Sequence, residues 1–499
     1  MRHLPVVALA LSLAGCCTCL EGPDAPFVPD RDPSPPAPQT PPTETPAQDD
    51  AEPPADCPWF YEVAYDDCTL PLPDAPVEPC LDEEGAICDG RLQGARPIQA
   101  VLGSDFGCAL FDSGRVKCWG GNHYGKLGLG HDMPWGRTAD EQGDALRYVD
   151  LGDGQRAVEI SATASGVCAL IQSGRVKCWG SNYRGQLGLG DGLHRGDHRG
   201  EMGDRLPFVD LGHQRAVHIS AGDSHVCALM GDGSVRCWGE NLWGLLGVGI
   251  LYGDIGDEPG EMGAHLPAVD LGPDCAPIRS LHAGGRSTCA LFEDGRVKCW
   301  GSNTHGDLGL GHDDYVGGDA AEMGAALPYV DLGGRVHHLA VGNRHACAVL
   351  DGGVKCWGEG HGGLMGRPMG SSEGLGDAPG EMGEALPFID LGRADPPIQV
   401  TAGSHHNCAL FADGWVKCWG QSLVDRSGLY VGLGDAPGEM GEALPYMPFA
   451  RPIVELVEGQ QGVCGWTDLG ELSCLGSVGL DRDPDASEND PLPAVDFGE

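Results

Sequence analysis

Cysteine is the most regularly spaced residue type in this chain, and thiols at fixed spacing can form disulfides, bind zinc or act as nucleophiles. Six pairs of cysteines are ten positions apart and one pair is nine apart. The shorter pair flanks Asp351 and Gly352, where other pairs flank three turn residues, and a two-residue Asp-Gly loop predicts a type I′ turn. The deletion falls in the turn, so the cysteines stay opposite one another in all seven pairs: Cys108 and Cys118, Cys168 and Cys178, Cys227 and Cys237, Cys289 and Cys299, Cys347 and Cys356, Cys408 and Cys418, and Cys464 and Cys474.

Opposed cysteines on two antiparallel strands are well placed to form disulfides. Directly opposite positions that are not hydrogen-bonded bring Cα atoms to about 4.5 Å, within disulfide range. Zinc ligation and free buried thiols are the alternatives, but zinc sites use closely spaced cysteines, and these pairs are not closely spaced. The export signal described below implies an oxidising compartment, so the sequence favours seven disulfides.

The remaining cysteines fall outside this pattern. Cys57, Cys68, Cys80 and Cys88 lie in residues 57–90, where we predict a small stalk with two disulfides, and three pairings are open. No partner is evident for Cys17, Cys19 and Cys275.

Histidine, a common general base and metal ligand, recurs in three of the repeats that hold the cysteine pairs. His225, His345 and His406 each lie two residues before the first cysteine of a pair. The equivalent residues in the other repeats are Phe106, Gly166, Ser287 and Gly462. A catalytic or metal-binding residue is needed once, at one place. We therefore interpret these histidines as hydrogen-bonding residues that stabilise the repeats. The sequence predicts no catalytic residue, no metal site and no cofactor.

Acidic, glycine-rich loops are the second recurrent feature. Three loops read Gly-Glu-Met-Gly, at residues 260–263, 380–383 and 438–441, and they follow Asp257, Asp377 and Asp435. Calcium takes six to eight oxygen ligands, and each loop offers only two or three carboxylates. We therefore favour ordered loops with methionine packed at a sheet edge, and keep calcium as the less favoured interpretation.

The N-terminus resembles an export signal. Arg2 and His3 precede an apolar run at residues 4–13, which is far shorter than the ~20 residues of a membrane-spanning helix. The following Leu-Ala-Gly-Cys is similar to the lipobox of bacterial lipoproteins. This predicts a signal peptide at residues 1–15 and lipid attachment at Cys16, with cleavage without lipidation as the alternative. Residues 16–56 are rich in proline and acidic residues and predict a disordered linker.

The cysteine pairs must be positioned by a repeat of about 60 residues that occurs seven times. Each repeat reads as an alternating apolar stretch, a hairpin that carries the two cysteines, a glycine-rich corner, an acidic loop and a last short strand. Four short strands per repeat predict one propeller blade. The sequence therefore predicts an all-β fold, a seven-bladed β-propeller of four-stranded antiparallel blades over residues 91–499. The tryptophan that follows the second cysteine in six repeats is expected between blades.

The two ends of the repeat region predict how the ring closes. The first repeat begins at Ile98 without a preceding Val-Asp-Leu-Gly strand, and residues 492–498 supply a segment of that type. We expect this C-terminal strand to complete the first blade and to remove an exposed sheet edge.

The repeat resembles a known family. Segments of the type His-x-Cys-Ala-Leu, Asp-Gly-x-Val-x-Cys-Trp-Gly and Asn-x-x-Gly-Gln-Leu-Gly are similar to the regulator of chromosome condensation repeat in its cysteine-bearing bacterial form. The likeness runs from about Pro97 to the C-terminus, and it implies seven blades of four strands. The eukaryotic members act on a nuclear GTPase and on chromatin, and an exported chain would meet neither.

The net charge of the chain argues against nucleic acid and anionic lipids as partners. Lysine and arginine total 31 against 73 acidic residues, a formal net charge of -42, and such a surface repels nucleic acid and anionic lipid headgroups. We predict a binding or scaffold module of the cell envelope that meets the membrane only through its lipid and binds an unknown protein through its loop faces, or a secreted one if Cys16 is not lipidated. An envelope hydrolase with its active site in the axial funnel is the alternative.

Overall fold

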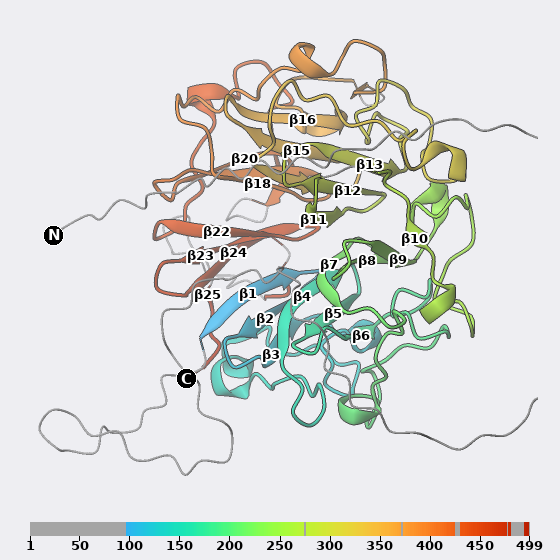
Figure 1. The fold of residues 1–499 in the computed structure, drawn as a ribbon. Helices are drawn as coiled ribbons and strands as arrows, with labels where there is room; N and C mark the ends of the chain where they lie inside the picture. The colour runs from blue at the N-terminus through green and yellow to red at the C-terminus, as the bar shows by residue number, and fades with distance from the viewer. Residues whose placement is uncertain are drawn as a thin grey trace, which may run out of the picture. The chain divides into compact units, whose positions relative to one another are not determined.

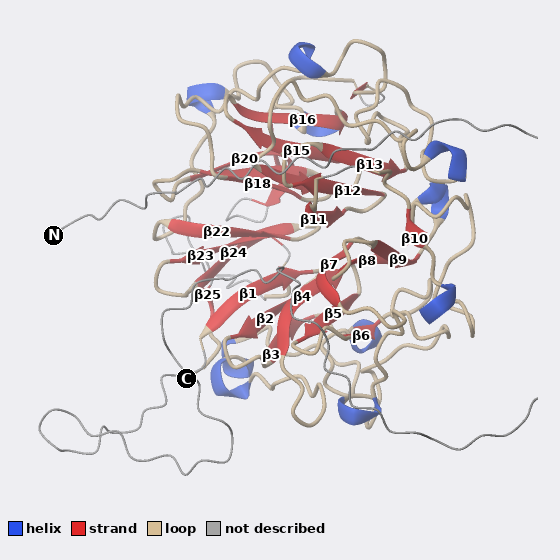
Figure 2. Ribbon diagram, in the orientation of Figure 1, coloured by secondary structure: helices blue, strands red, loops and turns tan. Residues whose placement is uncertain are grey.

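Seven small antiparallel sheets make up the described part of the chain. The structure, a computed structural model, describes residues 96–273, 276–370, 373–424, 430–476, 478–480 and 494–498. The predicted signal peptide, linker and stalk, the lipidation site Cys16, and Cys275 lie outside the described residues. No α-helix occurs in the described ranges, where ten single-turn 3-10 helices lie in the loops (Figure 2).

Each sheet begins with three strands in sequence order, as predicted. The first strands are β1 (Pro97–Leu102), β4 (Ala157–Thr163), β7 (Ala216–Ala221), β11 (Ile278–Ala283), β14 (His338–Val341), β18 (Gln399–Ala402) and β22 (Ile453–Glu458). The second strands are β2 (Phe106–Phe111), β5 (Gly166–Ile171), β8 (His225–Met230), β12 (Ser287–Phe292), β15 (His345–Leu350), β19 (His406–Leu410) and β23 (Gly462–Thr467). The third strands are β3 (Val116–Gly120), β6 (Val176–Gly180), β9 (Val235–Gly239), β13 (Val297–Gly301), β16 (Gly353–Glu359), β20 (Val416–Val424) and β24 (Leu472–Gly476).

The fourth strands are short. Two of them, β10 (Ala268–Val269) and β25 (Ala494–Val495), pair with the third strand of their sheet, and in other blades the pairing is reduced to single contacts such as Val209 N to Val176 O. Two further short strands, β17 (Gly374–Leu375) and β21 (Tyr430–Leu433), pair with the far ends of β16 and β20. The 3-10 helices are η1 (His123–Gly125), η2 (Ala139–Glu141), η3 (Gly143–Ala145), η4 (Gly203–Arg205), η5 (Leu242–Gly244), η6 (Gly263–His265), η7 (Ala320–Glu322), η8 (His361–Gly363), η9 (Gly383–Ala385) and η10 (Gly441–Ala443).

The sheets follow one another around a common axis and form a closed propeller. Successive first strands contact each other in the order β1, β4, β7, β11, β14, β18 and β22, and β22 contacts β1 again. Figure 1 shows the blue β1 beside the red β22, which are the ends of the repeat region. The predicted seven-bladed architecture is therefore confirmed.

The cores lie between blades. Second and third strands are buried on both faces, and the six tryptophans that follow a hairpin cysteine are fully buried. Trp179 Nε1 donates to the Lys126 carbonyl in the preceding blade, and Trp238 Nε1 donates to the Gln186 carbonyl in the same way. The predicted location of the tryptophans between blades is confirmed.

The predicted role of the C-terminal strand in the first blade is wrong. β25 pairs with β24 and so completes the seventh blade, while the first blade has its own fourth strand, in which Tyr148 pairs with Lys117. The physical reason is that each fourth strand bonds by its backbone to the third strand of its own blade and then touches the next blade. At the chain end this second contact closes the ring, because Gly143 N donates to the Asp496 carbonyl.

A buried lysine on the third strand also links neighbouring blades, and we call the contact between blades at this lysine the lysine seam. Lys177 Nζ donates to the carbonyls of Leu151, at the end of the preceding blade's fourth strand, and of Gly203, in its own blade. Lys298, Lys355 and Lys417 make equivalent pairs of bonds, and Lys117 bonds to the carbonyls of Gly143 and Phe497. Burial lowers the pKa of Lys117 and Lys177.

Every sheet contains one disulfide within its hairpin. The pairs are Cys108–Cys118, Cys168–Cys178, Cys227–Cys237, Cys289–Cys299, Cys347–Cys356, Cys408–Cys418 and Cys464–Cys474. The hairpin of Cys347 and Cys356 turns through Asp351 and Gly352, but neither residue has a positive φ, so the predicted type I′ turn is wrong. The left-handed conformation falls on the next residue, Gly353 (φ 130°), which spares Asp351 that strain.

Candidate functional site

The axial wall of the propeller is lined by polar side chains from the first strands. The third residue of the first strand is only half-buried and reaches the neighbouring first strand. Gln99 bonds through both amide atoms to the backbone of Ile160, and Gln399 bonds to Leu456 in the same way. These side chains satisfy backbone groups that would otherwise be orphaned at the wall.

His218 occupies the same position and joins three blades. Its Nδ1 lies 2.8 Å from Glu159 Oε1, and its Nε2 lies 3.3 Å from the Leu281 carbonyl. Burial lowers the pKa of His218, but its contacts with Glu159 and Leu281 outweigh burial, so this pKa is raised above its usual value. Both ring nitrogens of His218 thus face acceptors within the axial wall.

Two further histidines on adjacent first strands are held neutral. Burial lowers the pKa of His282 to about 3 and that of His338 to about 4. His282 Nε2 lies 2.8 Å from Ser280 Oγ on the same strand. Sequence analysis missed this wall, although the alternation of polar residues along the first strands was a signal for it.

At one end the axis widens into a cavity of about 170 Å³ that all seven blades line, mostly with glycine and alanine. Ser104 Oγ donates to Gln460 Oε1, and Gln460 Nε2 donates to Asp223 Oδ1, so three blades are tied across the axis. Burial raises the pKa of Asp223. The cavity is large enough for several waters, and its polar side chains are Thr163, Asp223, Asn343, Ser404, Glu458 and Gln460.

The recurrent histidines of the second strands connect neighbouring blades. His225 Nε2 lies 2.8 Å from Thr288 Oγ1, and His345 Nε2 lies 2.7 Å from Asn407 Oδ1, in each case in the next blade. His406 Nε2 lies 2.6 Å from Glu458 Oε1. Burial lowers the pKa of His225 to about 3 and that of His345 to about 4. The predicted hydrogen bonds of these histidines are present, and the structure adds that they cross between blades.

The glutamates of the acidic loops cap their own backbone. Glu261 Oε2 accepts from the N–H groups of Gly256 and Glu258, and Glu381 and Glu439 repeat this pattern. Within the described ranges, Asp197, His198 and Glu201 bring ligand atoms within 4.8 Å of one another, but Glu201 Oε2 already accepts two backbone bonds. The loop geometry thus explains the recurrent glutamate as a structural residue.

A buried carboxyl, Asp307, lies at the glycine-rich corner of the fourth blade. It is 1 % exposed, and neither of its oxygens makes a hydrogen bond of normal geometry, although the Ser302 hydroxyl lies close enough to favour the charged form. Burial and the nearby Glu359 raise its pKa to about 8, against the opposing effect of Arg344 and Arg286. Other blades have Lys126 or Gln186 at this corner, so an acidic residue there was a signal in the sequence.

This carboxyl makes stability depend on pH. The folded pKa lies above the unfolded value, so the folded state holds the extra proton and its stability falls as pH rises from about 4 to 8. We expect Asp307→Asn to remove this loss and to stabilise the protein at pH 8 by a few kcal/mol, with little effect at pH 4. Thermal unfolding at the two pH values measures the difference. The exposed Asp314→Asn variant is the control for loss of one charge, and an equal effect of both variants would contradict the prediction.

Exposed aromatic and apolar side chains gather on the loops that follow the third strands of the first two blades. We call Tyr124, Tyr183, Leu193 and His194 the aromatic patch. Tyr183 and Leu193 are 64 % and 66 % exposed. The ring centroids of Tyr183 and His194 are 4.5 Å apart, and those of Tyr124 and Tyr183 are 5.3 Å apart. The face of the propeller that carries these loops is called the loop face below.

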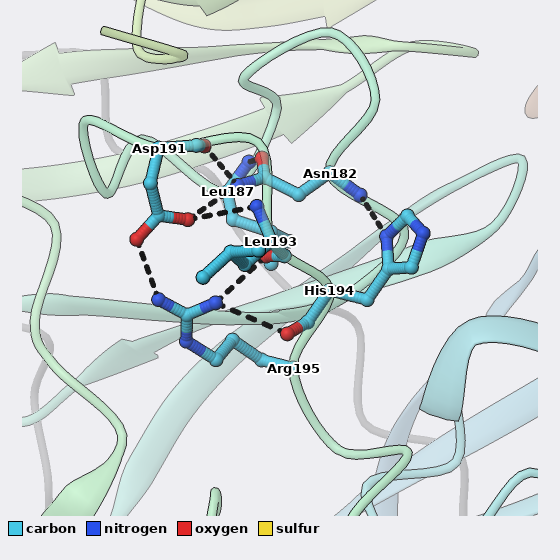
Figure 3. A network of polar contacts seen from close by, with 6 residues as sticks. All are labelled: Asn182, Leu187, Asp191, Leu193, His194 and Arg195. Carbon is cyan, nitrogen blue, oxygen red and sulfur yellow. Dashed lines mark hydrogen bonds and ion pairs between the residues drawn. The ribbon is translucent and has the colours of Figure 1, made fainter.

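A fixed network of hydrogen bonds holds this patch in place (Figure 3). The buried Asn182 accepts from Leu187 N and donates from its backbone N–H to His194 Nδ1. Asp191 accepts from Leu193 N and pairs with Arg195 at 2.6 Å. These bonds constrain a loop that presents a leucine to solvent.

Backbone strain accompanies the patch. Tyr124 (φ 66°) and Trp243 (φ 61°) are the only non-glycine residues with a positive φ in the described ranges, and both lie two residues after a buried asparagine. This conformation costs a non-glycine residue about 1–2 kcal/mol. The fifth blade has Gly362 at the equivalent position, and glycine adopts a positive φ without this cost.

Comparison with known sequences finds a repeat family that the first four blades resemble. The Regulator of chromosome condensation (RCC1) repeat matches residues 98–126, 157–186, 216–242 and 278–307, which run from the first strand to the glycine-rich corner of the first four blades. The human E3 ubiquitin-protein ligase HERC2 is 28 % identical over 275 residues, which are 54 % of this chain and 5 % of that protein. The Arabidopsis thaliana ultraviolet-B receptor UVR8 is 26 % identical over 55 % of this chain and 56 % of its own length.

A yeast relative is matched over more of the chain. The guanine nucleotide exchange factor SRM1 of Saccharomyces cerevisiae is 26 % identical over 66 % of this chain and 62 % of its own length. The chain thus spans less than two thirds of each of these relatives.

Solved structures agree on the fold. Human WBSCR16 superposes with a TM-score of 0.53 at 18 % identity and covers 73 % of this chain and 86 % of its own. Prp20p from Saccharomyces cerevisiae superposes with a TM-score of 0.51 at 20 % identity and covers 77 % and 83 %. In the part of the chain that the structure describes, no helix is long and apolar enough to span a bilayer. The chain is a seven-bladed β-propeller, and its first four blades match the model of the regulator of chromosome condensation repeat.

Proposed function

We propose that this protein is an exported, lipid-anchored binding module of the cell envelope that holds another protein at the loop face of its propeller. The observation that carries the proposal is the aromatic patch, which is exposed, strained at Tyr124 and fixed by the network around Asn182. Tyrosine is enriched among the residues that dominate binding energy at interfaces, and rigid loops lose little entropy on binding.

The axial wall supports binding over catalysis. A hydrolase in the axial funnel would need an imidazole basic enough to activate a nucleophile. His282 lies beside the Ser280 hydroxyl, but burial lowers its pKa to about 3, which makes it a weak base. Both nitrogens of His218 face acceptors, and the cavity at the end of the axis is lined mainly by glycine and alanine. Yeast Prp20p, which shares this fold, binds Gsp1p and histones, so a propeller of this kind can serve as a protein-binding surface.

Affinity capture with matched surface variants tests the proposal. Leu193 and Leu469 are exposed to similar degrees, 66 % and 59 %, but Leu469 lies in a turn between second and third strands, at the opposite end of the blades. We expect Leu193→Asp to lose a protein that the wild-type chain and Leu469→Asp both retain from envelope extracts. Retention by all three proteins would overturn the assignment of the loop face.

The lipid anchor has a separate test. We expect Cys16→Ser to move the protein from the membrane fraction to the soluble exported fraction, because a lipid on Cys16 is the proposed anchor. Fractionation followed by immunoblotting measures the distribution. Cys17→Ser removes the neighbouring thiol and should stay with the membrane, and a membrane-bound Cys16→Ser protein would refute lipidation.

A further inference from the structure

We infer that the aromatic patch receives an arginine side chain from a basic segment of the partner protein. The inference rests on the proposed function, since it names the chemistry of the partner at the same surface. It depends on a comparison between two blades that carry a strained aromatic residue at the same position.

In the third blade, an arginine of the chain itself covers the aromatic residue at this position. Trp243 has the same left-handed backbone as Tyr124, and the Arg286 guanidinium lies over its ring, 5.0 Å from the centroid. Arg286 comes from the next blade, three residues before its first hairpin cysteine. A guanidinium over an aromatic face is attracted by the negative charge of the ring.

The first blade lacks that guanidinium. The residue of the second blade that corresponds to Arg286 is Ser165, three residues before Cys168. Among the residues that the structure describes, no cation lies over the ring of Tyr124 or Tyr183. The rings of Tyr124 and Tyr183 pack against each other and against His194, and in the described ranges they carry no arginine or lysine.

Arginine over an aromatic ring recurs elsewhere in this propeller. The Arg115 guanidinium lies 3.4 Å from the centroid of Tyr148, and Arg175 lies at the same distance from Phe208. Aromatic side chains in this chain are thus repeatedly covered by arginine. Among the described residues, Tyr124 and Tyr183 differ because no arginine lies over their rings.

Charge and geometry both favour a basic occupant. The formal net charge of -42 draws a cationic segment to the protein, and aromatic faces reward a cation that arrives there. His194 Nδ1 accepts from Asn182 N, so Nε2 carries the proton and the ring orientation is fixed before binding. A planar guanidinium can stack on such rings, whereas an ammonium group cannot, so we expect a preference for arginine over lysine.

The test uses the full-length protein and two peptides that differ only in the cation. The probes are Gly-Arg-Gly-Arg-Gly and Gly-Lys-Gly-Lys-Gly with blocked ends, titrated calorimetrically at 0.15 M salt. We expect tighter binding of the arginine peptide. Tyr183→Ala should weaken its binding about two- to five-fold, while Tyr183→Phe should bind like wild type.

A matched control variant distinguishes loss of the aromatic patch from loss of any exposed tyrosine. Tyr252 is 59 % exposed in a loop of the third blade, and Tyr252→Ala should bind the arginine peptide like the wild-type protein. Equal affinity of the two peptides, or equal affinity of Tyr183→Ala and wild type, would overturn the inference. If Leu193→Asp nevertheless loses the captured partner, the proposed function stands and only the arginine assignment fails.

Discussion

A chain truncated after Pro491 is expected to lose its stable monomeric fold, because residues 492–499 include the fourth strand of the seventh blade. Removal of β25 leaves the edge of β24 unpaired, and an unpaired edge strand promotes aggregation. It also opens the contact that closes the ring, since Gly143 N and Lys117 Nζ lose the carbonyls of Asp496 and Phe497.

Most of the stability that the truncation is expected to remove comes from Phe497. Its ring is 8 % exposed and packs edge-on against Trp119 and Phe111, with centroids 5.6 and 5.7 Å away, and it stacks on Trp466. Loss of a buried phenylalanine costs about 3–5 kcal/mol, which is a large part of the 5–15 kcal/mol by which proteins are stable. The two hydrogen bonds at the seam add to this loss.

Size-exclusion chromatography and thermal unfolding test the truncation. We expect aggregation or a melting temperature lowered by roughly 10 °C or more. Phe497→Ala should show an intermediate loss, and removal of Glu499 alone should have little effect. A truncated protein that is monomeric and melts like the full chain would contradict the closure of the ring by β25.

Loss of a hairpin disulfide is expected to have the second largest effect. The loop between two hairpin cysteines is short, and chain-entropy arithmetic gives each bridge about 2.5–3 kcal/mol. We therefore expect the double variant Cys227→Ala, Cys237→Ala to be destabilised by about that amount. Because each bridge closes a loop within one hairpin, the effect should not depend on the state of the other six.

Denaturant unfolding of the double variant and peptide mapping without reductant provide the measurements. Mapping should find each cysteine bonded to the partner in its own hairpin. The sulfur atoms are buried, so dithiothreitol should reduce the bridges only after unfolding begins. A bond from Cys108 to a cysteine other than Cys118 would refute the hairpin assignment.

The blades could be predicted because their signals are local and occur seven times. Alternating apolar residues, a glycine turn and opposed cysteines specify each hairpin, and the register pairs Cys108 with Cys118 as the spacing requires. The tryptophans could be placed between blades from the side alternation of a strand alone.

The error about the last strand arose because this segment contacts two blades. The last strand touches the first blade through Asp496 and Phe497 while it pairs with the seventh, and a sequence cannot separate backbone pairing from contact across a seam. The axial wall and the aromatic patch were missed for a related reason. His218 meets Leu281, and Tyr124 meets Tyr183, only after neighbouring blades have docked.

The lysine seam also sets an order of events as the chain is made. Lys417 can find the carbonyls of Leu391 and Gly441 as soon as its own blade has formed. Lys117 in the first blade must wait for Phe497, which is synthesised 380 residues later. The earliest part of the propeller is thus the last to be finished, and until the final residues emerge the nascent protein is an open arc with two unsealed ends.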